Sequence, residues 1–261
     1  MDVYEQDELM KKRDYRVVKY NQLVQKSRYN LSVTEQRVIA YICSMIKPDK
    51  PSPETYNVPF QLEYEFDIRE YAKICGIHSD GGKLYEETKN ILKGLKQKIM
   101  WLELPNGTEV TVGWLAKVWV NKRSGIVKIK LDEDMVPYLF DLQNKFTAYG
   151  LINILALKSQ YSIRIYELMQ SYAYQKGATF DYDKLKKILM VDDNRGYDRY
   201  NNFKQRILEP AIHEINTYTG LNVSYEPIKK GRKIDKITFY ISKKDTFDRF
   251  IAHTKTNDEI K

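Results

Sequence analysis

The segment TFDYDKLKKIL, Thr179 to Leu189, indicates the fold because its pattern occurs twice in the chain. The matching segment is EFDIREYAKIC, Glu65 to Cys75. In both copies an apolar stretch ends at a Phe, an Asp follows at an expected helix N-cap, and a short helix with apolar residues at helical spacing begins there. Phe66 and Phe180 stand 114 residues apart, which indicates an internal repeat.

The sequence on both sides of this segment also repeats. A predicted helix precedes each copy, Val33 to Ile46 in the first and Lys158 to Tyr174 in the second. Ser32 and Glu35 form a capping box at the start of the first of these helices. Each copy is then followed by a glycine-containing loop, a longer amphipathic helix, and alternating apolar strands around a turn.

The turns of the two hairpins are expected at Asn106-Gly107 and at Lys230-Gly231. The repeated order is therefore helix, short strand, helix, helix and hairpin, which is the order of a winged helix. We predict an α+β fold of two tandem winged-helix domains with pseudo-duplicated topology, residues 1–135 and 136–261. Small units of this kind also serve as protein-interaction modules, and this alternative stays open.

The composition is that of a globular chain. With 261 residues the chain suits two domains, and 43% hydrophobic and 30% charged residues are ordinary for a folded protein. No apolar stretch reaches the ~20 residues that cross a bilayer, and the N-terminal stretch lacks the apolar core of a secretory signal. We therefore expect a cytoplasmic protein without a membrane span, in which Cys43 and Cys75 are small core residues.

The positive charge is concentrated near the C-terminus. The whole chain carries a net charge of +8, and between Asn222 and Lys244 seven Lys or Arg face two acidic residues, which leaves +5 there. A local positive field raises the rate of encounter with polyanions. The charge distribution therefore indicates nucleic acid or another acidic surface as the partner.

The last long helix, between Tyr200 and Gly220, has two different sides. At about 100° per residue, the apolar arc is formed by Phe203, Ile207, Ala211, Ile215 and Tyr218. The opposite arc carries Glu209, His213 and the four residues for which we expect DNA base contacts: Arg199, Asn202, Gln205 and Arg206. Arg pairs bidentately with guanine, and Asn or Gln with adenine. For each single residue the alternative is a solvated helix face.

Pro210 interrupts this helix. It lacks the amide that would bond to the residue four positions back, so we predict a bend after about the second turn. The hairpin that follows carries Lys229, Lys230, Arg232 and Lys233 around its tip. Flexible cations at a wing tip reach phosphates or the minor groove beside the reading helix. Together, the helix and the wing predict a DNA-binding site in which the helix contacts bases and the wing contacts phosphates.

The corresponding face of the first copy is less basic. Its outward residues, for which we expect a secondary DNA contact, are Lys83, Asn90, Lys93 and Gln97. The hairpin quoted as WLELPNGTEVTVGWLAKVWV has almost no cationic tip but many large apolar residues: Trp101, Trp114, Leu115 and Trp119. Part of this sheet is expected either to pack against another subunit or to be buried against the rest of the chain.

Motifs for catalysis are missing from the sequence. His78, His213 and His253 are scattered without an HxH pair, so the many tyrosines have no metal site that would support DNA nicking. The sequence contains neither a GxxxxGK[ST] phosphate loop nor a Cys/His set with zinc spacing nor a GxSxG elbow. We predict no enzymatic activity, no metal and no cofactor.

Three stretches resemble the replication initiator proteins of theta-replicating plasmids with iterons. They are Val17 to Ile42, Tyr161 to Tyr172 and Phe203 to Ile241, in the same order as in that family. The resemblance implies tandem winged helices that bind direct repeats of double-stranded DNA at a plasmid origin. It also implies a monomer–dimer equilibrium, with dimers that repress the initiator's own promoter, and host replication factors as partners. Arg206 matches a basic position of the family's reading helix, and Lys230, Gly231 and Arg232 match its wing.

Two alternatives to an origin initiator remain open at this point. The same folds would serve a transcription repressor without origin function, or a scaffold that uses winged helices to bind proteins instead of DNA.

Overall fold

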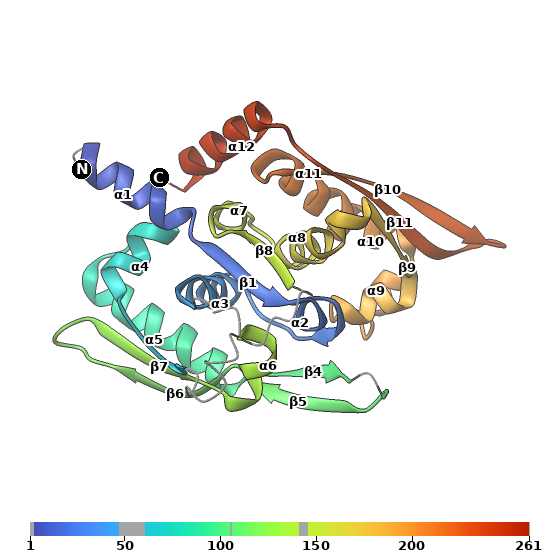
Figure 1. The fold of residues 1–261 in the computed structure, drawn as a ribbon. Helices are drawn as coiled ribbons and strands as arrows, with labels where there is room; N and C mark the ends of the chain where they lie inside the picture. Colours follow the sequence, from blue (N-terminus) through green and yellow to red (C-terminus); the bar gives the residue numbers. More distant parts are fainter. Residues whose placement is uncertain (1–2, 47–60, 105, 141–145, 261) are drawn as a thin grey trace, which may run out of the picture.

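The computed structural model describes residues 3–46, 61–104, 106–140 and 146–260. Figure 1 shows two β-ribbons that extend to opposite edges of the molecule. The elements of the first part are α1 (Val3–Arg13), β1 (Arg16–Tyr20), α2 (Asn21–Lys26), β2 (Ser27–Arg28), α3 (Val33–Met45), β3 (Glu63–Asp67), α4 (Ile68–Cys75), α5 (Gly81–Gln97), β4 (Ile99–Glu103), β5 (Glu109–Gly113), β6 (Leu115–Val120), β7 (Ile126–Leu131), η1 (Glu133–Met135) and α6 (Val136–Leu139).

The second part begins with a strand that pairs with β1. Its elements are β8 (Phe146–Gly150), α7 (Ile152–Leu155), α8 (Gln160–Tyr172), η2 (Ala173–Gln175), β9 (Gly177–Asp181), α9 (Tyr182–Ile188), η3 (Arg195–Asp198), α10 (Tyr200–Phe203), η4 (Lys204–Leu208), α11 (Glu209–Tyr218), β10 (Leu221–Lys230), β11 (Lys233–Lys243) and α12 (Thr246–Glu259). The antiparallel pair β1–β8 joins residues from either side of the domain boundary expected after residue 135, and that boundary stays a prediction.

Local sequence explains where the helices of the first copy begin. The Ser32 hydroxyl accepts from the Glu35 amide while the Glu35 carboxylate accepts from the Ser32 amide, which confirms the capping box at α3. Asp67 caps α4 by accepting from the amides of Arg69 and Glu70. Asp181 stands at the same position before α9 but makes no cap bond, and its carboxylate lies 3.6 Å from the Lys236 amine.

The two copies have the same sheet topology. In the first, β7 lies between β3 and β6, and in the second, β11 lies between β9 and β10. The short strand before each helix-turn-helix therefore pairs with the second strand of its own wing. This arrangement confirms the α+β fold with a duplicated winged-helix plan.

One correspondence between the copies was wrong. The hairpin expected around Asn106-Gly107 exists as β4–β5, and Gly107 adopts φ 82° in its turn. However, β4 and β5 form a separate sheet with β2, so they are not the counterpart of the C-terminal wing. The N-terminal wing is β6–β7, and a simple alternation of apolar residues could not distinguish these two consecutive hairpins.

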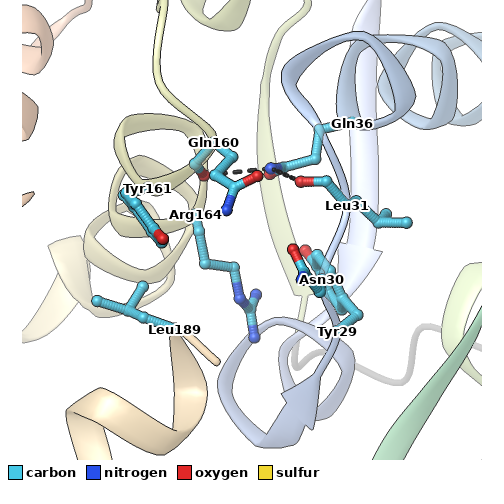
Figure 2. Close-up of a pocket in the computed structure, with 8 residues that line it drawn as sticks. All are labelled: Tyr29, Asn30, Leu31, Gln36, Gln160, Tyr161, Arg164 and Leu189. Carbon is cyan, nitrogen blue, oxygen red and sulfur yellow. Dashed lines mark hydrogen bonds between the residues drawn. The ribbon is translucent and has the colours of Figure 1, made fainter. Parts of the chain in front are cut away.

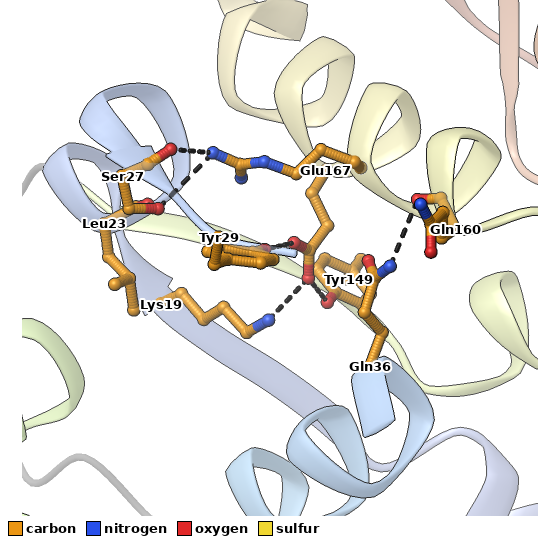
Figure 3. Close-up of polar contacts among 9 residues, drawn as sticks. Lys19, Leu23, Ser27, Tyr29, Gln36, Tyr149, Gln160 and Glu167 are labelled. Carbon is orange, nitrogen blue, oxygen red and sulfur yellow. Dashed lines mark hydrogen bonds and ion pairs between the residues drawn. The ribbon is translucent and has the colours of Figure 1, made fainter. Parts of the chain in front are cut away.

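Helix α8 connects the two winged helices. It is the first helix of the second one, and it also packs against β8 and against α2 and α3 of the N-terminal part. Its Glu167 is buried and accepts from the Lys19 amine at 2.6 Å and from the Tyr29 hydroxyl at 3.3 Å, and Tyr149 donates to the same carboxylate (Figure 3). Burial raises the pKa of Glu167, but the charge and hydrogen bond of Lys19, the hydrogen bond from Tyr149 and the charge of Arg164 together hold it below the ordinary value.

A second polar group on α8 fixes the segment after α2. The Arg164 guanidinium donates to the Ser27 carbonyl at 2.6 Å and lies 4.6 Å from the centre of the Tyr29 ring. Beside it, Gln36 donates to the Gln160 carbonyl at 3.1 Å (Figure 2). The cavity between these residues has a volume of about 10 Å³, so it has room for one water-sized group and is not a ligand site.

The large apolar residues of the β4–β6 region divide into two groups. Trp114 and Leu115 are buried in the core, whereas Trp101 on β4 and Trp119 on β6 are 42% and 37% exposed. Cys43 and Cys75 are buried and unpaired, as expected. Within the described ranges, no helix is both long enough and apolar enough to cross a membrane.

Candidate nucleic-acid interface

The C-terminal reading helix runs through α10, η4 and α11. Phe203, Ile207, Ala211 and Ile215 are buried, which confirms the predicted apolar arc. These side chains hold the helix against the body of the domain, where α11 packs on α8 and β10. The opposite arc is therefore left facing solvent.

The four predicted base-contacting residues lie on this outward arc or at its start. Gln205 and Arg206 are exposed within η4, and Arg199 is exposed as the N-cap residue of α10. Asn202 is half-buried, and its amide nitrogen donates to the Gly196 carbonyl at 2.8 Å. Arg199, Gln205 and Arg206 are therefore available to a partner, whereas the Asn202 amide nitrogen is already bonded.

The helix changes its hydrogen-bond pattern just before Pro210. Segment η4 is π-helical, and the Glu209 amide donates to the carbonyl of Lys204, five residues back. Pro210 then stands in the first turn of α11, where its missing amide costs little. The interruption lies where the sequence predicts it but takes the form of a π-turn, and the bend of the axis stays a prediction.

The wing β10–β11 extends away from the body of the molecule (Figure 1). Its strands are joined at Gly231-Arg232, and Gly231 has φ 63°, a left-handed conformation that suits glycine in a two-residue hairpin turn. The four cations predicted for phosphate contact are all exposed: Lys229, Lys230, Arg232 and Lys233. None of the four forms an ion pair with another residue that the structure describes.

The N-terminal counterpart of the reading helix is α5. Leu84, Leu92 and Leu95 point into the core. The predicted secondary contact residues all lie on its exposed side: Lys83, Asn90, Lys93 and Gln97. Lys83 lies 3.7 Å from the Glu87 carboxylate and Lys89 lies 3.8 Å from the Glu86 carboxylate, so part of the positive charge of this helix is paired.

The tip of the N-terminal wing is basic, which corrects the expectation that this copy lacks a cationic tip. Lys122 and Arg123 are exposed in the turn between β6 and β7. The Asn121 side chain accepts from the amides of Arg123 and Ser124, and Gly125 closes the turn with φ 75°. The sequence signal was present as NKRSG between the alternating stretches LAKVWV and IVKIKL.

The outer face of the sheet β2–β4–β5 carries two exposed apolar side chains next to the Arg28–Glu109 ion pair. Ile99 and Trp101 lie on the same side of β4 and are 55% and 42% exposed. Strand β5 stands at the edge of this sheet. An exposed apolar face beside a strand edge is typical of a surface that pairs with another chain.

No group of three or more His, Cys, Asp or Glu in the described part of the chain could hold a metal ion. The described surface instead offers two outward helix faces, each followed by a wing with a basic tip. This arrangement defines a tandem winged-helix protein of the DNA-binding class. The chain belongs to the initiator replication protein family, whose WH1 model matches residues 16–170 and whose WH2 model matches residues 181–241.

The chain is also similar to individual initiators. It is 25% identical to a "Replication initiation protein" of Escherichia coli over 233 residues, 86% of this chain and 69% of the relative. It is 29% identical to a "PI protein" of Escherichia coli over 192 residues, 64% of this chain and 63% of that relative. The chain therefore spans about two thirds of each relative's length.

The fold is found in a solved structure whose description is "Pi initiator protein in complex with iteron DNA". That structure superposes with a TM-score of 0.69 at 22% identity and covers 89% of this chain and 99% of its own. The match supports the two-domain winged-helix architecture independently of the sequence motifs.

Proposed function

We propose that this protein starts plasmid replication by binding iterons, the direct repeats of an origin, as sequence-specific double-stranded DNA sites. The observation that carries the proposal is the exposed pair Gln205 and Arg206 on a helix followed by a wing with four exposed cations. Membership of the initiator family and the iteron complex of the similar Pi initiator support it. The proposal involves no catalytic step, metal or cofactor.

The two parts of the C-terminal site have different tasks in this proposal. Arg199, Asn202, Gln205 and Arg206 contact base edges in the major groove, since Arg, Asn and Gln match the donor and acceptor pattern of guanine and adenine. Lys229, Lys230, Arg232 and Lys233 contact phosphates and fix the register of the helix on the duplex. The wing supplies affinity, and the helix supplies sequence preference.

The N-terminal copy makes a second contact. Helix α5 offers Lys83, Asn90, Lys93 and Gln97, and the wing tip adds Lys122 and Arg123. The two wings lie at opposite ends of the molecule (Figure 1). Two winged helices arranged in this way suit successive major-groove segments about one helical turn, ~10 bp, apart. We keep residues 1–135 and 136–261 as the two functional units.

The protein self-associates through the outer face of β2–β4–β5 in this proposal, and the dimer represses the protein's own promoter. Ile99 and Trp101 provide the apolar contact. Trp101→Glu would place a charge in that contact and keep the protein monomeric in sedimentation experiments. A dimer that persists in this variant would place the interface elsewhere. Host replication factors are the further partners of the monomer.

A footprint on candidate direct repeats at moderate salt tests DNA binding. Protection of each repeat is the expected result, whereas a protein-binding scaffold gives no protection. A second assay separates an initiator from a plain repressor: a plasmid that carries only the repeats replicates when this protein is supplied. Failure of replication despite a clear footprint would favour the repressor.

A further inference from the structure

Glu209 is an acidic side chain on the outward arc of the reading helix. It is exposed and stands three residues after Arg206. Phosphates repel a carboxylate, so an acid on a surface that approaches DNA lowers affinity unless it makes a favourable contact there. Its position therefore calls for an explanation beyond the interaction with the helix dipole, which any acid in the first turn of α11 would supply.

The π-turn determines the surroundings of Glu209. In a regular α-helix, residues five apart point about 140° away from each other. In η4 the Glu209 amide bonds to the Lys204 carbonyl, and this wider turn brings the two side chains to the same side. The Lys204 amine lies 3.3 Å from the Glu209 carboxylate. The Lys204 side chain therefore extends from the apolar arc to the outer face of the helix, where its ion pair holds the Glu209 carboxylate in place.

This ion pair is not explained by stability. The Lys204 and Glu209 side chains are 41% and 50% exposed, and exposed pairs contribute about 0–1 kcal/mol. Its effect is on charge and geometry. The ammonium group offsets the repulsion between the carboxylate and the phosphates, and it limits the positions that the carboxylate can take.

We propose that Glu209 is a specificity-determining residue that accepts a hydrogen bond from the N4 amino group of a cytosine in the major groove. A carboxylate is the side chain that suits this donor, just as Arg suits guanine. Lys204 is a positioning residue that acts through Glu209. The inference rests on the proposed function, in which the C-terminal helix contacts bases. It names one of these bases, beside the base that Arg206 contacts.

The experiment measures the affinity of the full chain for a set of duplexes in which every base pair of the repeat is replaced in turn. Glu209→Gln should change the preferred base pair at one position from C·G toward A·T, because an amide side chain pairs with adenine. The ratio of the affinity for C·G to the affinity for the other base pairs at that position should fall about tenfold. Lys204→Met should weaken discrimination at that same position alone. Glu226→Gln removes the same charge from an exposed residue of the wing and is the matched control.

The outcomes separate this inference from the proposed function. A wild-type protein without preference at any position would overturn both. A wild-type protein with preference, together with a Glu209→Gln variant that binds all duplexes more tightly with an unchanged profile, would overturn this inference alone. In that case the carboxylate only repels phosphates, as the control residue does.

Discussion

In the proposed function, Arg206 is a side chain that contacts a base. Arg206→Ala should reduce discrimination at one base pair by about 1–3 kcal/mol. Lys230→Ala is the comparison, because the loss of one phosphate contact lowers affinity equally for all sequences and reduces the slope of log K against log salt by about 0.9. Affinities for matched and mismatched duplexes at several salt concentrations give both quantities. Unchanged base preference in Arg206→Ala would remove this residue from the reading set.

Glu167 shows how charge is held inside the protein. Glu167→Gln leaves the buried Lys19 ammonium without its counter-charge, and breaking a buried pair in this way costs about 3–5 kcal/mol. Urea unfolding at neutral pH measures the loss. Glu86→Gln is the control, because its exposed pair with Lys89 is 3.8 Å long and such pairs contribute about 0–1 kcal/mol.

The pH dependence of the same variant follows from the direction of the pKa shift. The folded pKa of Glu167 lies below its ordinary value of 4.5, so the carboxylate stabilises the fold fully above that value. This contribution is lost as the pH falls through the folded pKa. The difference in unfolding free energy between wild type and Glu167→Gln should therefore shrink in acid. A difference that stays constant down to acid unfolding would contradict the pair's role.

Gly76 and Gly82 form a matched pair of substitutions. Gly76 ends α4 with φ 64°, and a Cβ there would lie 2.0 Å from the carbonyl oxygen of Ile260. Gly76→Ala should therefore cost at least ~1–3 kcal/mol from the backbone conformation, and more because the end of the chain must move. Gly82 in α5 has open space around it, so Gly82→Ala should be neutral or stabilise by about 0.4–1 kcal/mol. Thermal unfolding compares the two.

At the scale of elements, the sequence predicts the parts whose causes are local. Helix caps such as Ser32 with Glu35, the apolar arc of the reading helix and the basic C-terminal wing depend on neighbouring residues, and the structure has all three. The choice of β6–β7 as the N-terminal wing depends on pairing with β3, which is distant in sequence. The π-turn lies directly before Pro210, so the sequence marks its position but not its hydrogen-bond pattern.

The N-terminal wing provides the test at this scale. Lys122→Ala and Arg123→Ala should each reduce the slope of log K against log salt by about 0.9 if the wing contacts phosphates. Lys255→Ala on α12 removes one exposed charge from a helix on the opposite side of the molecule and should leave the slope unchanged (Figure 1). Equal slopes in all three variants would show that only the C-terminal half binds the duplex backbone.

The two winged-helix domains can bind one DNA site together only if the distance and orientation between them stay fixed. Helix α8 is the physical reason to expect this, because it belongs to the C-terminal winged helix and is bound to the N-terminal part through Lys19–Glu167 and Arg164–Ser27. Buried polar contacts of this kind have directional geometry, so they resist sliding more than an apolar seam does. The two wings at opposite ends should then engage one face of the duplex together.

Inserting about 5 bp between the two halves of a repeat tests this rigidity, because half a helical turn moves one half-site to the opposite face. Affinity should fall to that of the C-terminal contacts alone, and the footprint should shrink to one half-site. The double variant Lys122→Ala with Arg123→Ala should lose less affinity than the wild type when 5 bp are inserted, because its N-terminal wing contact is already weakened. Inserting about 10 bp returns both half-sites to the same face of the duplex but leaves them farther apart, so the affinity should recover only in part. Full affinity with 5 bp inserted would mean that the halves turn independently and that α8 does not set their spacing.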